Sequence, residues 1–120
     1  MAWNFDNNLP VYIQIMKKIE EDILAGKYGK DEQIPSVRQL AMEAAVNPNT
    51  MQKALSELEK NGILESRRTS GRFVTSDDKI LEGIRENNLS EIIVDFLGKI
   101  KAYNLSKEEL IKLIEEELEG

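Results

Sequence analysis

The chain has 120 residues and a formal net charge of -6, which is the size of one domain or of a small domain with an appended element. It contains neither cysteine nor histidine, which excludes disulfides and thiolate metal sites and removes the commonest general base, so we expect no enzyme, cofactor or metal. No stretch approaches the roughly 20 apolar residues of a membrane span, and a cytoplasmic protein with no membrane partner is expected.

The first 25 residues are expected to form an extended arm followed by a helix. Trp3 and Phe5 in the arm (residues 1–9) dock on the body of the fold or, as the alternative, contact a partner. Pro10 stands where a helix can begin, and Gly26 suits the residue that ends it. The residues whose helical spacing predicts one buried face are Tyr12, Met16, Ile19 and Ile23.

A helix-turn-helix is predicted next along the chain. Ile34 precedes a proline and must be extended or in a turn. Ser36 caps a second helix, and Gln39 completes a capping box three residues later. Only two residues then separate this helix from Asn47, which caps a third helix that has Pro48 at its first position. Two helices joined by so short a turn have the form of a helix-turn-helix.

The third helix has an apolar stripe and an opposite polar face. Its apolar residues are Met51, Ala54, Leu55 and Leu58. Its polar residues are Asn49, Gln52, Lys53 and Ser56. Asn and Gln side chains match an adenine edge and helix N-termini favour phosphate, which indicates a recognition helix, although water alone also explains a polar face. Arg38 opposes the dipole of the second helix, and either a DNA contact or an ion pair with a nearby carboxylate would explain it.

A β-hairpin with a basic tip is predicted after the third helix. Gly62 follows Asn61 and is expected to end the helix in a left-handed conformation. Residues 63–66 and 72–75 are β-prone, and Gly71 lies in the turn between them. The arginines of the hairpin are Arg67, Arg68 and Arg72. A solvated turn is the ordinary explanation, but after a recognition helix we interpret the hairpin as a wing on the phosphate backbone or in the minor groove.

Residues 76–120 are predicted to form a separate two-helix tail, and residues 1–75 the winged domain. The first 75 residues hold ten basic and ten acidic side chains, whereas the tail holds six and twelve, so the negative excess lies in the tail. Ser76 with two aspartates caps the first tail helix, and Asn87-Asn88 is expected to interrupt or weaken it. Ser106 and Glu109 form a second capping box that opens the last helix.

The tail carries more apolar surface than one neighbouring helix covers. It packs against its own winged domain or, as we favour, against the tail of a second chain. The predicted homodimer interface consists of Leu89, Ile92, Ile93, Phe96, Leu97, Ile100, Tyr103, Leu110 and Ile114. A two-fold axis would place two recognition helices in successive major grooves, roughly 34 Å apart.

Ordered motifs in residues 9–75 also carry a resemblance to a known family. They are Pro10-Val11-Tyr12-Ile13-Gln14-Ile15, Ile34-Pro35-Ser36-Val37-Arg38-Gln39-Leu40-Ala41, Val46-Asn47-Pro48-Asn49-Thr50, and Arg67-Arg68 with Gly71 and Phe73-Val74. Together they resemble the GntR family of bacterial transcription regulators, and the short tail resembles its YtrA subfamily, which lacks a larger ligand-binding domain. The resemblance implies a dimeric winged-helix repressor that binds a palindromic operator in double-stranded DNA, often close to genes for ABC transporters.

The resemblance implies roles for particular residues. Arg38 matches the DNA-contacting arginine that follows the family's Pro-Ser, and Gly71 matches a wing glycine. Residues at the start of the recognition helix contact bases and phosphates in the family. The whole predicted DNA-binding set is Ser36, Arg38, Asn47, Asn49, Thr50, Gln52, Lys53, Arg67, Arg68, Gly71 and Arg72.

The chain departs from the family pattern at two places. Asp31 stands where glycine is usual before the Pro-Ser motif, which implies a differently shaped turn. Thr69 and Ser70 replace the usual Gly-Lys of the wing, and Arg72 stands where a small polar residue is common. These changes imply a stiffer wing with rearranged phosphate contacts.

The sequence bears on three classes of function. A sequence-specific DNA-binding regulator is favoured. The alternative is a winged-helix protein-interaction module with the acidic tail as its binding surface, which predicts no salt-sensitive DNA binding. An enzyme has no phosphate-binding glycine loop and no carboxylate pair in an apolar setting to support it. Any small-molecule effector, of unknown identity, is expected to bind between the winged domain and the tail.

Overall fold

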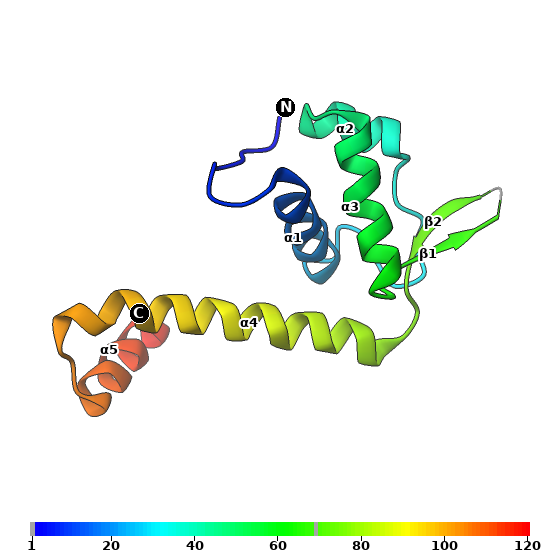
Figure 1. Ribbon diagram of the computed structural model, residues 1–120. Helices are drawn as coiled ribbons and strands as arrows, with labels where there is room; N and C mark the ends of the chain where they lie inside the picture. Colours follow the sequence, from blue (N-terminus) through cyan, green and yellow to red (C-terminus); the bar gives the residue numbers. More distant parts are fainter. Residues whose placement is uncertain (1, 69) are drawn as a thin grey trace. The chain divides into compact units, whose positions relative to one another are not determined.

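The computed structural model describes residues 2–68 and 70–120 (Figure 1). The elements in these residues are α1 (Val11–Leu24), α2 (Val37–Ala44), α3 (Pro48–Lys60), β1 (Leu64–Arg67), β2 (Gly71–Val74), α4 (Asp78–Ile100), a 3-10 turn η1 (Lys101–Tyr103) and α5 (Lys107–Glu119). The chain forms two compact units, Met1–Arg85 and Glu86–Gly120, and the division between them falls within α4. The predicted fold class, mainly helical with one small β-hairpin, is confirmed.

The N-terminal arm is fastened to α1 by one side chain. The Gln14 amide accepts from the backbone N–H of Asp6 at 3.0 Å and donates to the carbonyl oxygens of Asp6 and Leu9 at 2.9 and 2.8 Å. Trp3 and Phe5 are partly buried against the core, as predicted. Met1, at the start of the predicted arm, lies outside the described residues.

The helix-turn-helix has the predicted caps. The Ser36 hydroxyl accepts from the backbone N–H of Gln39 at 3.1 Å, and the Asn47 side chain accepts from the N–H of Asn49 at 2.7 Å. In the turn between α2 and α3, Ala45 is left-handed with φ +57°. That conformation lets the N–H of the next residue, Val46, bond the carbonyl oxygen of Ala41 at 3.0 Å.

The left-handed conformation of Ala45 leads to a prediction for the free energy of unfolding. A left-handed conformation costs an L-residue roughly 1–2 kcal/mol, whereas glycine costs about 0.5–1 kcal/mol through the unfolded chain. Ala45→Gly is therefore expected to raise the free energy of unfolding by up to about 1 kcal/mol. Ala44→Gly, one residue earlier, is the control at a helical position and should lower it by at least about 1 kcal/mol, because this residue is helical and its methyl group is buried. Urea denaturation measures both, and a destabilised Ala45→Gly would contradict the role of this turn.

The core of the first unit is built around α3. This helix packs against α1, α2 and β1, and its predicted apolar stripe is fully buried. Ile80, Leu81 and Ile84 from the first turns of α4 also contact this core. The buried core residues are Ile15, Ile19, Ile23, Tyr28, Ile34, Leu40, Ala41, Ala44, Met51, Ala54, Leu55, Leu58, Ile63, Leu64, Val74 and Ile84. The compact winged unit thus continues beyond residue 75.

The hairpin follows a glycine-ended α3 and extends from the helical body (Figure 1). Gly62 is left-handed with φ +79°, as predicted. The strands pair in antiparallel register from Leu64 opposite Val74 to Arg67 opposite Gly71. They are shifted by one residue from the predicted runs.

A third extended segment, which the sequence pattern did not predict, lies beside β2. Gln33 pairs with Phe73 as an isolated bridge, and the N–H of Ile34 donates to the carbonyl oxygen of Arg72 at 3.0 Å. The N–H of Asp31 likewise donates to Val74 at 3.0 Å. The connection before the helix-turn-helix is therefore fixed to the hairpin.

The prediction of an interruption at Asn87-Asn88 was wrong, because α4 is continuous through both residues. Asparagine costs a helix interior only about 0.7 kcal/mol, and the Asn87 amide donates to Glu91 one turn later at 3.4 Å. The predicted second capping box is confirmed, with Ser106 and Glu109 bonding each other's backbone N–H groups. No helix in residues 2–68 and 70–120 is long and apolar enough to cross a membrane.

Candidate nucleic-acid interface

The start of α3 presents polar side chains to solvent. Asn49, Gln52 and Lys53 are exposed, and Thr50 is half-buried. The Gln52 amide donates to the Ser56 hydroxyl at 3.2 Å, which orders both side chains along one face of the helix. The oxygen of Asn47 is occupied by the cap described above, so this residue shapes the helix start as well as lying on the face.

Lys53 is held by a neighbouring helix. Its ammonium nitrogen lies 4.0 Å from the centre of the Tyr12 ring, which belongs to α1. A cation over an aromatic face is attracted to the ring's negative quadrupole while it keeps its charge. The ring therefore positions a positive charge beside the polar face of α3, a contact that the spacing of residues along the sequence did not reveal.

Arg38 is exposed in the first turn of α2. Among the described residues no carboxylate lies within ion-pair distance of it. The ion pair that was the alternative explanation for this arginine is thus not found there, and a contact with DNA stays a prediction. Ser36, two residues earlier, is also exposed and caps the helix.

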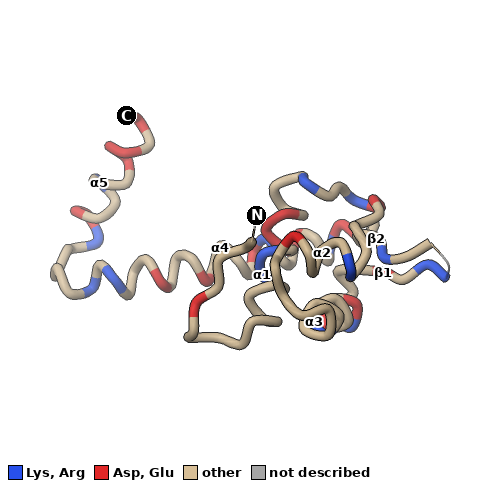
Figure 2. Tube along the Cα trace, turned by 90° about the horizontal axis from the view of Figure 1, so that it is seen from above, with Lys and Arg blue, Asp and Glu red and all other residues tan. Residues whose placement is uncertain are grey.

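The arginines of the wing differ in whether they are ion-paired within the protein. Figure 2 shows Lys and Arg positions at the far end of the hairpin. Arg68 is exposed there, whereas Arg67 is ion-paired with Asp31 and lies 3.8 Å from a Glu65 oxygen. The Arg67 guanidinium also lies 4.1 Å from the centre of the Phe73 ring. Arg67 is thus engaged with the protein, whereas no ion pair joins Arg68 to another residue that the structure describes.

Arg72 is also engaged with the protein. Its guanidinium is ion-paired with Glu59 at the end of α3, and the same carboxylate accepts from the Ser66 hydroxyl at 2.8 Å. Burial raises the pKa of Glu59, but the hydrogen bonds from Arg72 and Ser66 and the arginine's charge outweigh burial and lower that pKa below its usual value. The carboxylate is therefore charged and paired at neutral pH.

Among the described residues of the wing region, three have a left-handed backbone, and one of them is Arg68 with φ +32°. Gly71 has φ +103°, and a Cβ there would lie 3.0 Å from the Gln33 amide nitrogen. That nitrogen donates to the carbonyl oxygen of Ser70, so the space is occupied. Asp31 has φ +66°, which is a conformation that glycine adopts more easily. Thr69, one of the departures from the family's wing pattern, lies outside the described residues.

The predicted dimer residues all belong to the second unit, where most are solvent-exposed. Ile92, Ile93 and Tyr103 are more than half exposed, and Ile100 and Leu110 are partly buried. A mainly apolar groove of about 370 Å³ runs between α4 and α5. It is lined by Phe96, Ile100, Leu105, Leu110, Leu113, Ile114, Glu117 and Leu118.

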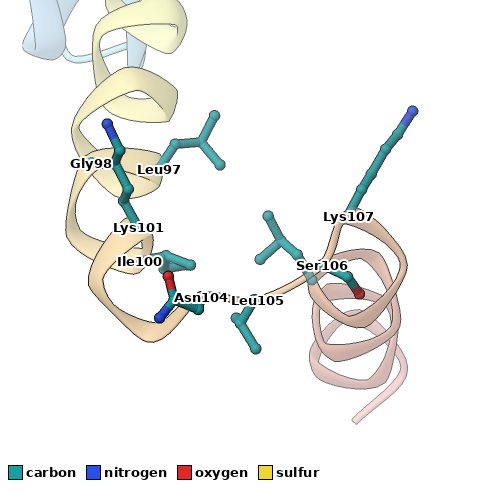
Figure 3. Close-up of a pocket in the computed structure, with 9 residues that line it drawn as sticks. Leu97, Gly98, Ile100, Lys101, Asn104, Leu105, Ser106 and Lys107 are labelled. Carbon is teal, nitrogen blue, oxygen red and sulfur yellow. The ribbon is translucent and has the colours of Figure 1, made fainter.

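A second pocket of the tail lies at the connection between its helices and has a volume of about 500 Å³. Leu97 and Ile100 from α4 point toward Leu105 and the start of α5 (Figure 3). Apolar surface thus continues around the helical connection.

A helix-turn-helix with an exposed polar second helix and a basic hairpin behind it defines a winged helix-turn-helix, a class of DNA-binding domain. The family model described as "Bacterial regulatory proteins, gntR family" matches residues 11–74. The chain belongs to the GntR family and is a transcription regulator with a DNA-binding domain, not an enzyme. The family resemblance read from the motifs is confirmed.

Two relatives from Bacillus subtilis (strain 168) match most of the chain. YhcF, an uncharacterised HTH-type transcriptional regulator, is 33% identical over 116 residues, which cover 97% of this chain and 96% of YhcF. YtrA, an HTH-type transcriptional repressor, is 35% identical over 94 residues, which cover 74% and 72%. These matches support the assignment to a YtrA-like branch.

Two solved structures of related proteins are similar to this chain in fold and sequence. A GntR family transcriptional regulator from Listeria monocytogenes has a TM-score of 0.84 and 30% identity, covering 93% of this chain and 98% of that chain. The DNA-binding domain of AraR in complex with operator ORX1 has a TM-score of 0.56 and 31% identity, covering 60% and 93%. The first match extends over the tail, and the second is shorter.

Proposed function

We propose that this protein is a homodimeric repressor that binds an inverted-repeat operator. The observation that carries the proposal is the exposed polar face at the start of α3, placed in a helix-turn-helix beside an arginine with no protein partner among the described residues. The AraR domain, similar in fold, is in complex with an operator, and the relative YtrA is named a repressor.

The residues of the winged unit divide into two roles. Asn49 and Gln52 carry the paired donor and acceptor groups that read adenine edges in the major groove. The phosphate-facing side chains supply affinity without sequence preference. They are Ser36, Arg38, Asn47, Thr50, Lys53 and Arg68. The backbone at Gly71 approaches the duplex closely. Arg67 joins this set once its guanidinium exchanges the carboxylate of the protein for a phosphate.

The tail supplies the dimer. Its apolar groove and exposed stripe leave large side chains in water, which is costly for a monomer and is relieved when the same surface of a second copy covers them. Two-fold symmetry of the protein would be matched by two-fold symmetry of the operator. Occupation of a promoter by the dimer blocks polymerase, and the site of action is the bacterial cytoplasm.

Selection of bound duplexes from a random pool, at two salt concentrations and with the full chain, tests this function. The expected result is enrichment of one inverted repeat, with weaker retention at the higher salt because bound phosphates release counterions. Failure to enrich any sequence at either salt concentration would contradict the proposal and favour a protein-interaction module.

A further inference from the structure

One carboxylate in the last turn of α3 binds both strands of the hairpin. Glu59 accepts from the Ser66 hydroxyl at 2.8 Å and pairs with the Arg72 guanidinium. Ser66 in β1 and Arg72 in β2 are direct cross-strand partners. A single oxygen atom, Oε1 of Glu59, therefore ties the two strands to α3 at the same position of the ladder.

The burial of this network sets Arg72 apart from the exposed arginines of the winged unit. The Arg72 side chain is 16% exposed and that of Glu59 is 30% exposed, whereas Arg68 and Arg38 are exposed. Solvent screens a partly buried pair less than a surface pair, so the interaction is stronger here. The charge of Arg72 is thus directed at the protein itself.

The partners of Glu59 form the third of the four strand pairs, one pair before the turn of the wing. The polar face lies at the other end of the same helix. Residues of both regions are expected to meet one duplex at a fixed separation. A hairpin that is mobile in the free protein would have to be ordered on binding, which lowers affinity, whereas a hairpin fixed beforehand avoids that loss. The network therefore has a geometry suited to preorganising the wing.

We propose that Glu59 and Arg72 are positioning residues, which hold the wing in a fixed orientation on α3, and that Arg72 is not a phosphate contact. The proposal rests on the proposed function, because it assumes that α3 and the wing bind the same operator. It revises the role that the sequence pattern assigned to Arg72.

Amide hydrogen exchange of the DNA-free full chain tests the network without DNA. Glu59→Gln and Arg72→Gln are each expected to increase exchange of the β1 and β2 amides about tenfold, because opening of the hairpin becomes easier. Glu57→Gln is the matched control, since Glu57 lies on the same helix and pairs with Lys60 at 3.7 Å. Unchanged hairpin protection in both test variants would overturn the proposal.

Binding to the sequence recovered by selection gives a second test. Each single variant is expected to bind about tenfold more weakly, and the double variant no more weakly than either single, because the two residues act as one unit. The slope of log affinity against log salt should stay unchanged in Arg72→Gln. Arg68→Gln serves as the positive control and should reduce the magnitude of that slope by about 0.9 per chain.

If Arg72 contacts phosphate, the substitution Glu59→Gln should change the affinity for DNA in the opposite direction. Glu59→Gln would then bind as well as the wild type or more tightly, because a negative charge near DNA is removed and the arginine is released. Arg72→Gln would also reduce the magnitude of the salt slope by about 0.9 per chain. Either result would overturn the positioning role. A wild-type chain that binds no DNA would refute the proposed function instead, while the exchange measurement would still decide whether the network holds the wing.

Discussion

Ile93→Glu is expected to dissociate the proposed dimer and to remove binding to the full inverted repeat. Ile93 is 54% exposed in the single chain, so the substitution leaves the tail able to fold. In the dimer the change would bury one carboxylate per chain, and each costs several kcal/mol without a partner. Since 1.4 kcal/mol is a factor of ten, the dimer dissociation constant should rise at least about 100-fold. Sedimentation velocity over a concentration series measures it.

Val94→Glu is the matched control for this substitution. Val94 is the next residue of α4, is 68% exposed and lies off the heptad stripe that contains Ile93. The two variants have the same charge and nearly the same composition. An Ile93→Glu chain that stays dimeric, or two variants that dissociate equally, would show that the stripe is not the interface.

Arg38→Ala is expected to weaken operator binding about 100-fold. A hydrogen bond to a charged group is worth about 1.5 kcal/mol at the low end, and a dimer loses two of them, or about 3 kcal/mol. If the arginine contacts phosphate, the salt slope should fall in magnitude by about 1.8 for two chains. If it contacts a base, the sequence preference at one position of each half-site should relax instead. Fluorescence anisotropy at several salt concentrations distinguishes the two.

Arg85→Ala controls for the general loss of positive charge. Arg85 belongs to the same compact unit and pairs with Glu82 at 3.3 Å. It is expected to leave operator affinity within about threefold, in line with an exposed ion pair worth under about 1 kcal/mol. If Arg38→Ala changed affinity no more than Arg85→Ala, Arg38 would have no part in the DNA interface.

Much of the fold was predictable because its signals are local. The caps at Ser36, Asn47 and Ser106 each depend on a residue two or three positions later, and the stripe of α3 depends on spacings of three and four. Such relations can be recognised from residues that are close together in the sequence. The break expected at Asn87-Asn88 is absent from α4. The weak helix preference of asparagine costs less free energy than the helix gains by continuing through both residues.

The state of the wing arginines was not predictable, because it depends on distant partners. Arg67 pairs with Asp31, which is 36 positions away, and Arg72 pairs with Glu59, which is 13 positions away. Both partners are among many carboxylates in the chain, and no spacing rule selects them. The sequence of a basic hairpin therefore indicates the charge of a wing. It does not indicate which of the arginines remain available to bind phosphate.

Binding to duplexes with altered half-site spacing tests the central claim, a symmetric dimer reading an inverted repeat. The recovered repeat is compared with one in which about half a helical turn, roughly 5 base pairs, is inserted between the half-sites. The account predicts two chains per original site, and a loss of at least about 100-fold in affinity after insertion, because one recognition helix then faces the wrong side of the duplex. One chain per site, or equal affinity for both spacings, would contradict it.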